Sequence, residues 1–331
     1  MAGKRHVGPF AVEPVALGCM SLSHAYGVPP SEEEGERLIA RAIDIGVDFL
    51  DTAALYGMGH NERLVGRALK GKRDRVTLAS KCGLRIIDGE RRIDGSAEGV
   101  RIVLDDSLQR LGVDVIDLYY LHRVDPAVPI EESVGALADG VKAGKVRAIG
   151  LSEASAETLR RANAVHPIAA MQSEYSLWTR NPEIAVLEEC RKLGTAFVAF
   201  SPVGRGFLSD RDVDLATLPD NDVRQVMPRF KGEDNAANRA LLPAFRRLAE
   251  RLGMSAAQLA IAWVLARAPH IVALPGTASI AHLEEDFAAR DIVLDAATMA
   301  ELDGIIHRGN VRGARYSPPV QKMIDTEEFA D

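Results

Sequence analysis

The chain has 331 residues, of which 47% are hydrophobic and 26% charged, and its formal net charge is −7 at pH 7. This composition indicates a globular protein with a sizeable core, and a single α/β barrel reaches this length. Positive and negative residues are mixed along the chain, which argues against nucleic acid or an anionic membrane as a partner.

Membrane-span and secretion patterns are weak in this sequence. The longest apolar runs, such as Ala256 to Ala266, are too short to cross a bilayer, and the opening residues MAGKRHVGPF lack the apolar core of a signal peptide. We therefore expect a cytoplasmic protein. Its three cysteines, Cys19, Cys82 and Cys190, are widely spaced and odd in number, which fits reduced thiols better than a disulfide framework. The histidines show no metal-ligand spacing, so we predict no metal site.

Short β-rich runs alternate with amphipathic helical stretches from about residue 15 to about residue 289. Helix starts are marked by capping side chains and acidic first turns near Ser31, Asn61, Ser96, Ile130, Ser155, Asn181 and Ser279. The expected strands are 15–17, 49–50, 76–79, 115–121, 146–150, 170–172, 196–200 and 271–273. About eight such units predict a single (β/α)8 barrel over residues 1–331. A Rossmann fold has no support, because no Gly-x-Gly-x-x-Gly follows the first strand.

Several segments lie outside the repeat. The stretch 204–234 is rich in Gly, Pro and Asp, which predicts a long functional loop after the seventh strand, such as a lid. The tail 309–331 is irregular and is expected to fold over the barrel mouth. Residues 7–12 are expected to form a hairpin closing the barrel bottom. Further helices are expected over 238–252, 255–268 and 296–307.

Four titratable side chains follow the expected strands, at the rim where barrel enzymes carry their chemistry. Asp51 follows the second strand, Tyr56 lies in the loop beyond it, Lys81 follows the third strand and His122 the fourth. Four charged or polar residues at one rim make little sense as packing, because buried charges are costly unless paired.

As chemistry, these four residues suit the reduction of a carbonyl group. Hydride addition needs a proton for the developing alkoxide, and a phenol with its usual pKa of about 10 is a poor proton source unless its neighbours tune it. Lys81, held by Asp51, is expected to lower the pKa of Tyr56, and His122 to orient the carbonyl oxygen. A cofactor must supply the hydride, because no side chain donates one.

In order along the chain, many segments resemble the aldo-keto reductase family. They are 51–57 (DTAALYG), 61–62 (NE), 80–81 (SK), 117–122 (DLYYLH), 149–152 (IGLS), 172–176 (QSEYS), 199–206 (AFSPVGRG) and 275–277 (PGT). The runs 150–155 (GLSEAS) and 227–230 (MPRF) are similar to the bacterial and plant branch that includes pyridoxal-reductase-like and perakine-reductase-like enzymes.

The resemblance implies a (β/α)8 barrel that uses NADP(H), with Tyr56 as general acid, Lys81 and Asp51 as the pair that tunes it, and His122 orienting the substrate. It places Ser152 and Gln172 at the nicotinamide carboxamide and Phe200 against the ring. The remaining cofactor positions that it implies are Ser201, Val203 and Arg205 at the pyrophosphate, and Gly276, Thr277, Glu285 and Asp286 at the adenosine.

Some positions depart from the family pattern. Ala278, Ser279 and His282 stand where many relatives carry Lys or Arg beside the adenosine 2′-phosphate, so NAD(H) remains open as a cofactor. Asp286 replaces a common Asn. Glu153 stands where many relatives place an Asn at the nicotinamide.

The substrate pocket and the activity also leave choices open. Candidate pocket residues are Met20, Ser21, Tyr26, Met58, Arg123, Trp178 and Phe230. One rival function is a lyase that forms a Schiff base through Lys81, and another is a redox-sensing regulatory subunit of the same fold. The substrate, the reaction direction and the oligomeric state do not follow from the sequence.

Overall fold

The computed structural model describes residues 3–87 and 89–329. Eight parallel strands lie in the order β3-β4-β5-β8-β9-β10-β11-β12. The first and last strands also meet, since the Ala16 amide donates to the Ala273 carbonyl (2.9 Å) and the Gly18 amide to the Pro275 carbonyl (2.8 Å). The predicted (β/α)8 barrel is thus confirmed. Its strands are β3 (Leu17–Gly18), β4 (Phe49–Asp51), β5 (Thr77–Cys82), β8 (Ile116–Leu121), β9 (Val146–Ser152), β10 (Ile168–Glu174), β11 (Ala196–Phe200) and β12 (Ile271–Leu274).

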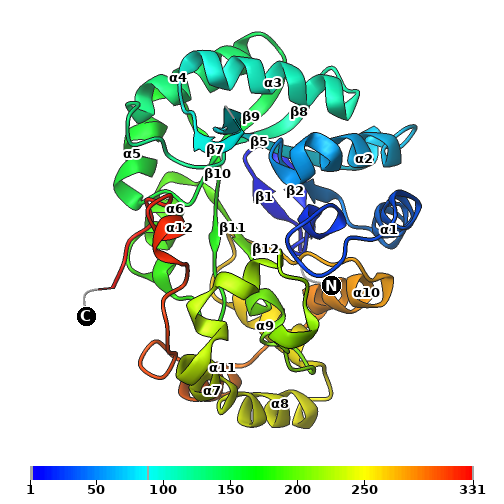
Figure 1. Ribbon diagram of the computed structural model, residues 1–331, viewed down its shortest axis with the longest axis vertical. Helices are drawn as coiled ribbons and strands as arrows, with labels where there is room; N and C mark the ends of the chain where they lie inside the picture. Colours follow the sequence, from blue (N-terminus) through cyan, green and yellow to red (C-terminus); the bar gives the residue numbers. More distant parts are fainter. Residues whose placement is uncertain (1–2, 88, 330–331) are drawn as a thin grey trace.

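Helices surround the barrel (Figure 1). Ser31 begins the first of them with a capping box, because its hydroxyl accepts from the Glu34 amide and the Glu34 side chain accepts from the Ser31 amide. The helices are α1 (Glu32–Ile45), α2 (His60–Ala68), α3 (Ala97–Leu111), α4 (Ile130–Lys142), α5 (Ala156–Val165), α6 (Val186–Leu193), α7 (Gly232–Arg239), α8 (Leu242–Arg251), α9 (Ala256–Ala266), α10 (Ile280–Ala288), α11 (Ala296–Ile305) and α12 (Pro318–Gln321).

Two helix predictions differ from the structure. The helix expected over 238–252 is divided into α7 and α8, and Pro243 lies in the first turn of α8, where its missing N–H costs nothing. Asn181 begins only a short 3-10 turn, Asn181–Glu183, before α6. None of the helices in residues 3–87 and 89–329 has the length and apolar character needed to cross a membrane.

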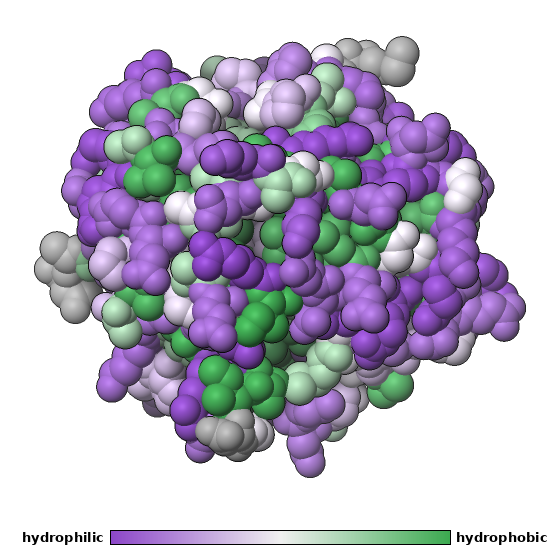
Figure 2. All heavy atoms as spheres, turned by 90° about the horizontal axis from the view of Figure 1, so that it is seen from above, coloured by the Kyte–Doolittle hydropathy of each residue, from purple (hydrophilic) through white to green (hydrophobic). Residues whose placement is uncertain are grey.

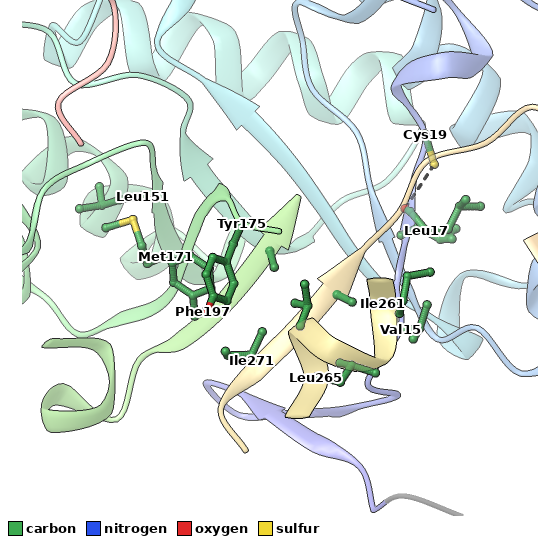
Figure 3. Packing of buried hydrophobic residues seen from close by; sticks show 14 of the residues in the cluster. Val15, Leu17, Cys19, Leu151, Met171, Tyr175, Phe197, Ile261, Leu265 and Ile271 are labelled. Carbon is green, nitrogen blue, oxygen red and sulfur yellow. Dashed lines mark hydrogen bonds between the residues drawn. The ribbon is translucent and has the colours of Figure 1, made fainter. Parts of the chain in front are cut away.

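The core has two parts. Between the barrel and its helices, Ile261 and Leu265 of the almost wholly apolar helix α9 pack near Val15 and Ile271 (Figure 3). The second part fills the interior of the barrel. The predicted hairpin, formed by β1 (Arg5–Val7) and β2 (Phe10–Val12), contributes Val7 and Val12 to this interior cluster. Hydrophilic residues dominate the outer surface seen from above (Figure 2).

Gly8 turns this hairpin with φ = 55°, and a Cβ there would lie 2.7 Å from the Ala169 Cβ, so no other residue fits without a shift.

A second hairpin, β6 (Leu84–Ile87) and β7 (Glu90–Ile93), leaves the end of β5 before α3 begins. This hairpin is not apparent from the sequence, because three of its eight strand residues are arginines, which hide the strand pattern. The long loop after β11 contains short 3-10 turns, including Leu215–Thr217 and Val223–Val226. The tail runs past α5 and α6 (Figure 1), where Asp325 accepts from the Ser155 amide (3.0 Å).

Candidate active site

Neighbouring strands bring the four predicted residues to one rim of the barrel. Asp51 is the last residue of β4, and Tyr56 opens the 3-10 turn Tyr56–Gly59 that follows. Lys81 is the fifth residue of β5, and His122 directly follows β8. Because β4, β5 and β8 are adjacent and parallel, their carboxyl ends meet at the same edge.

Lys81 lies at the centre of this group. Its fully buried ammonium donates to the Asp51 carboxylate, to the Thr52 carbonyl (2.8 Å) and to the Tyr56 hydroxyl (3.3 Å). The second carboxylate oxygen of Asp51 accepts from the Gln172 side chain (2.9 Å). The structure therefore brings Asp51, Tyr56, Lys81 and Gln172 into one hydrogen-bonded cluster.

Burial and charge oppose each other at this cluster. Burial disfavours the Lys81 ammonium, but the Asp51 carboxylate and Tyr56 outweigh it, and the pKa of Lys81 is raised. Burial also raises the pKa of Tyr56, while the Lys81 charge lowers it, and the net direction is upward. Lys81 thus lowers the pKa of Tyr56 as expected, but burial exceeds this effect. Tyr56 is therefore a protonated phenol at neutral pH, and its hydroxyl accepts a hydrogen bond from the Lys81 ammonium.

His122 faces Tyr56 edge-on, with 5.8 Å between the ring centroids. Burial, together with the nearby Arg123 charge, holds the pKa of His122 well below its ordinary value, so its imidazole is neutral. Its buried Nδ1 has no hydrogen-bond partner within the described part of the chain. The Tyr56 ring also contacts a second imidazole, that of His24, with 5.4 Å between the ring centroids. His24 was not among the site residues expected from the sequence, because no metal-ligand spacing links the histidines.

Cys82, next to Lys81, is a buried thiol whose pKa is raised by burial. A buried, protonated thiol is a poor nucleophile, which supports a structural role for this residue.

The predicted cofactor residues follow the rim onward from this cluster. Ser152 ends β9 and pairs in register with Gln172 of β10, and the half-buried Phe200 ends β11. Ser201 has φ = 52°, an uncommon conformation for a serine, and it starts the turn that contains Val203. Gly276 and Thr277 follow β12, the strand beside β11. These positions form a strip across consecutive strand ends, which suits an extended molecule.

Asp286, near the end of that strip on α10, is an unusual carboxyl group. Burial, with a smaller effect from the neighbouring Glu285, raises the pKa of Asp286 to about 8. Asp286 therefore carries a proton at neutral pH and is able to donate a hydrogen bond. Glu285 is half-buried, and its backbone carbonyl accepts from Gln258 (3.2 Å).

Arg205 lies in an internal network rather than along the open strip. Its guanidinium donates to Glu174 (2.6 Å) and to the hydroxyls of Tyr26 and Tyr316 (2.9 Å each). Its side chain is 6% exposed. The contact of Arg205 with a pyrophosphate stays a prediction.

The same network ties the tail to the rim. Arg315 donates to Glu153, directly after β9, and to Glu174 at the end of β10 (3.1 Å). Burial opposes the Glu174 charge, but Arg205 and Arg315 outweigh it and lower the pKa of Glu174 to about 2. This network could not be predicted from the sequence, because Arg315 lies far along the chain from both carboxylates. The one indication of it in the sequence was Glu153, an acidic residue at a position where many relatives carry Asn.

Two predicted pocket residues, Trp178 and Phe230, lie in an aromatic cluster. The Trp178 ring stacks on Phe207 (4.2 Å between centroids) and meets Phe230 edge-on (5.4 Å). Both side chains are nearly fully buried.

A parallel barrel with a Tyr–Lys–Asp cluster and a neutral imidazole at the carboxyl ends of its strands defines a carbonyl oxidoreductase of the barrel class. The model of the Aldo/keto reductase family matches residues 14–307. The chain belongs to the aldo/keto reductase family.

Individual relatives agree with this membership. A probable aldo-keto reductase 1 from Glycine max is 42% identical over 309 residues, which cover 93% of this chain and 89% of the relative. The aldo-keto reductase yakc of Schizosaccharomyces pombe, whose name specifies NADP(+), is 40% identical over 327 residues, or 97% of this chain and 96% of the relative. A solved glycerol dehydrogenase from Gluconobacter oxydans superposes with a TM-score of 0.85 at 29% identity, covering 96% of this chain and 98% of that one.

Proposed function

We propose that this protein is an NADPH-dependent reductase that converts an aldehyde or ketone to an alcohol, reversibly, with Tyr56 as the proton donor. The observation that carries the proposal is the contact of the Tyr56 hydroxyl with a Lys81 ammonium that Asp51 keeps charged. Membership in the family supports the carbonyl chemistry.

Each residue of the cluster has a distinct role in this reaction. The Tyr56 hydroxyl gives its proton to the carbonyl oxygen, and Lys81 stabilises the negative charge that then develops on the phenol. Asp51 maintains the Lys81 charge, and Gln172 holds Asp51 in place. The neutral His122 donates a hydrogen bond to the carbonyl oxygen and thereby orients it.

The bound nicotinamide would supply the hydride. We assign Ser152, Gln172 and Phe200 to its binding, Ser201, Val203 and Arg205 to the pyrophosphate, and Gly276, Thr277, Glu285 and Asp286 to the adenosine. The strip of strand ends and the orphaned Nδ1 of His122 fit this placement. The name of the fission-yeast relative supports NADPH over NADH, although no Lys or Arg occurs between residues 275 and 289.

The two rival functions have less support. A Schiff-base lyase needs a neutral amine, whereas Lys81 is a buried ammonium with three oxygen partners. A purely regulatory role does not account for the complete catalytic cluster. We further propose that residues 1–331 form one domain, since both the hairpin and the tail pack on the barrel. Its cytoplasmic location stays a prediction.

The test is Tyr56→Phe, assayed by the loss of NADPH absorbance with a panel of aldehydes and ketones. Turnover should fall by about 10²- to 10⁴-fold, the range that a general acid contributes to the rate. NADPH binding, followed by fluorescence, should stay close to wild type. Tyr119→Phe is the matched control, because Tyr119 is buried against Ser107 on the outer side of the same sheet. Survival of turnover in Tyr56→Phe would exclude the proton-donor role.

A further inference from the structure

Arg123 is a buried cation next to the proposed catalytic imidazole, and no described residue is its anionic partner. Arg123 is 8% exposed. Its Nη1 donates to the His122 carbonyl (2.7 Å) and to the Ser152 hydroxyl (3.4 Å), both neutral oxygens. Its Nε is buried and has no hydrogen-bond partner in residues 3–87 and 89–329. A buried charge in this state is costly unless it serves a ligand.

A second arginine approaches from the hairpin over the site. Arg91 of β7 is paired with Ile86, and both lie on the sheet face of the buried Leu84, although Ile86 and Arg91 are themselves exposed. Arg91 is solvent-exposed, yet partial desolvation and the positive charge of Arg123 lower its pKa. The next residue, Arg92, points to the opposite face and pairs with Glu90 (3.1 Å).

Three carboxylates on the surrounding strands and loops are already paired with other cations. Asp51 binds Lys81, Asp94 binds Arg85 (2.5 Å), and Glu153 binds Arg315. Within the described ranges, Arg91 and Arg123 form no ion pair. Among the described residues, Arg91 and Arg123 are thus two cations on the hairpin side of the site that no carboxylate pairs.

We propose that Arg123, assisted by Arg91, forms an anion subsite beside the carbonyl position, and that the preferred substrates are carbonyl compounds that carry a carboxylate. This inference rests on the proposed reductase function and specifies its substrate class. A guanidinium binds a carboxylate through two parallel hydrogen bonds, and Arg123 has its Nε available for one of them. The subsite is separate from the proposed pyrophosphate position, because β8 and β11 are separated by two strands in the sheet.

Paired substrates test this subsite. We would measure kcat/KM with NADPH for succinic semialdehyde against its methyl ester, and for the three carboxybenzaldehyde isomers against benzaldehyde. The carboxylates should be preferred by about 10- to 100-fold, the range expected for hydrogen bonds to a charged group. This preference should decrease with added salt. The same comparison for phosphate uses glyceraldehyde 3-phosphate and glyceraldehyde. A larger preference for the phosphate than for the carboxylates would overturn the choice of carboxylate.

Variants connect the preference to the two arginines. Arg123→Gln should remove most of the preference in kcat/KM for the acid over its ester, and Arg123→Lys should keep part of this preference. Arg91→Gln, on an exposed hairpin where misfolding is not a concern, should reduce the ratio by about 3- to 10-fold. Arg92→Gln, the neighbour on the other face, is the matched control and should keep the wild-type ratio.

The possible failures are distinguishable. If no carbonyl compound is reduced, the proposed function itself is wrong. If neutral aldehydes are reduced and carboxylates are not preferred, only the anion subsite is wrong. If Arg123→Gln weakens NADPH binding and lowers acid and ester turnover equally, Arg123 serves the cofactor, which also overturns the inference.

Discussion

Arg315, in the C-terminal tail, forms a fully buried ion pair with Glu153 at the end of β9. The pair places the tail against the strand whose last residue, Ser152, we assign to the nicotinamide. Glu174 completes the arrangement by accepting from both Arg315 and Arg205.

Arg315→Met should destabilise the protein by about 3 to 5 kcal/mol, because it leaves the Glu153 carboxylate buried without its partner. Thermal unfolding would measure the loss. Adding Glu153→Gln should recover a large part of it, since the double variant has no uncompensated charge at this pair. Arg312→Met, an exposed position three residues away, is the control. A double variant no more stable than Arg315→Met alone would contradict this account.

Lys81→Met should raise the apparent pKa of Tyr56, because the Lys81 charge opposes the effect of burial. Alcohol oxidation requires the phenolate, so its kcat/KM should rise with pH up to the pKa of Tyr56. In the variant this rise should move to higher pH and the rate at pH 7 should fall by at least about 100-fold. An unchanged pH profile would show that Lys81 does not tune Tyr56.

Asp286→Asn should remove a loss of stability that the wild type suffers as the pH rises from about 4 to about 8. The unfolded carboxyl titrates near 3.8 and the folded one near about 8, so between these values only the folded state keeps the proton. Stability from this group is full below pH 3.8 and is lost as the pH rises toward 8. The variant should therefore match wild type near pH 4 and exceed its melting temperature by several degrees at pH 8. A constant difference across this range would mean that Asp286 is not protonated.

His282→Arg should increase the preference for NADPH over NADH by about tenfold, since a guanidinium binds the 2′-phosphate and gains nothing from a hydroxyl. Steady-state kinetics with both cofactors would measure the ratio. His307→Arg, at an exposed position beyond α11, is the control. An equal effect of both substitutions would remove the support for an adenosine site near α10.

The sequence alone could predict only features that depend on neighbouring residues or on a regular period along the chain. Each expected strand overlaps a barrel strand or, at Val15, a bridge beside one, because the buried apolar runs and capping residues are local signals. Asp51, Tyr56, Lys81 and His122 could be grouped because parallel strands end at a common rim. The hairpin β6–β7 could not be found this way, since its charged residues hide its period.

Tertiary structure alone decided the electrostatics. The net pKa of Tyr56 depends on how completely the barrel excludes water, and the sequence contains no measure of that burial. The pairing of Arg205 and Arg315 with Glu174 likewise depends on distances between segments far apart in the chain, as does the lack of a carboxylate partner for Arg123 among the described residues. The local sequence pattern determines the helices and strands and their order. The pKa of each titratable group depends instead on its exposure to water and on the charged groups that folding places around it.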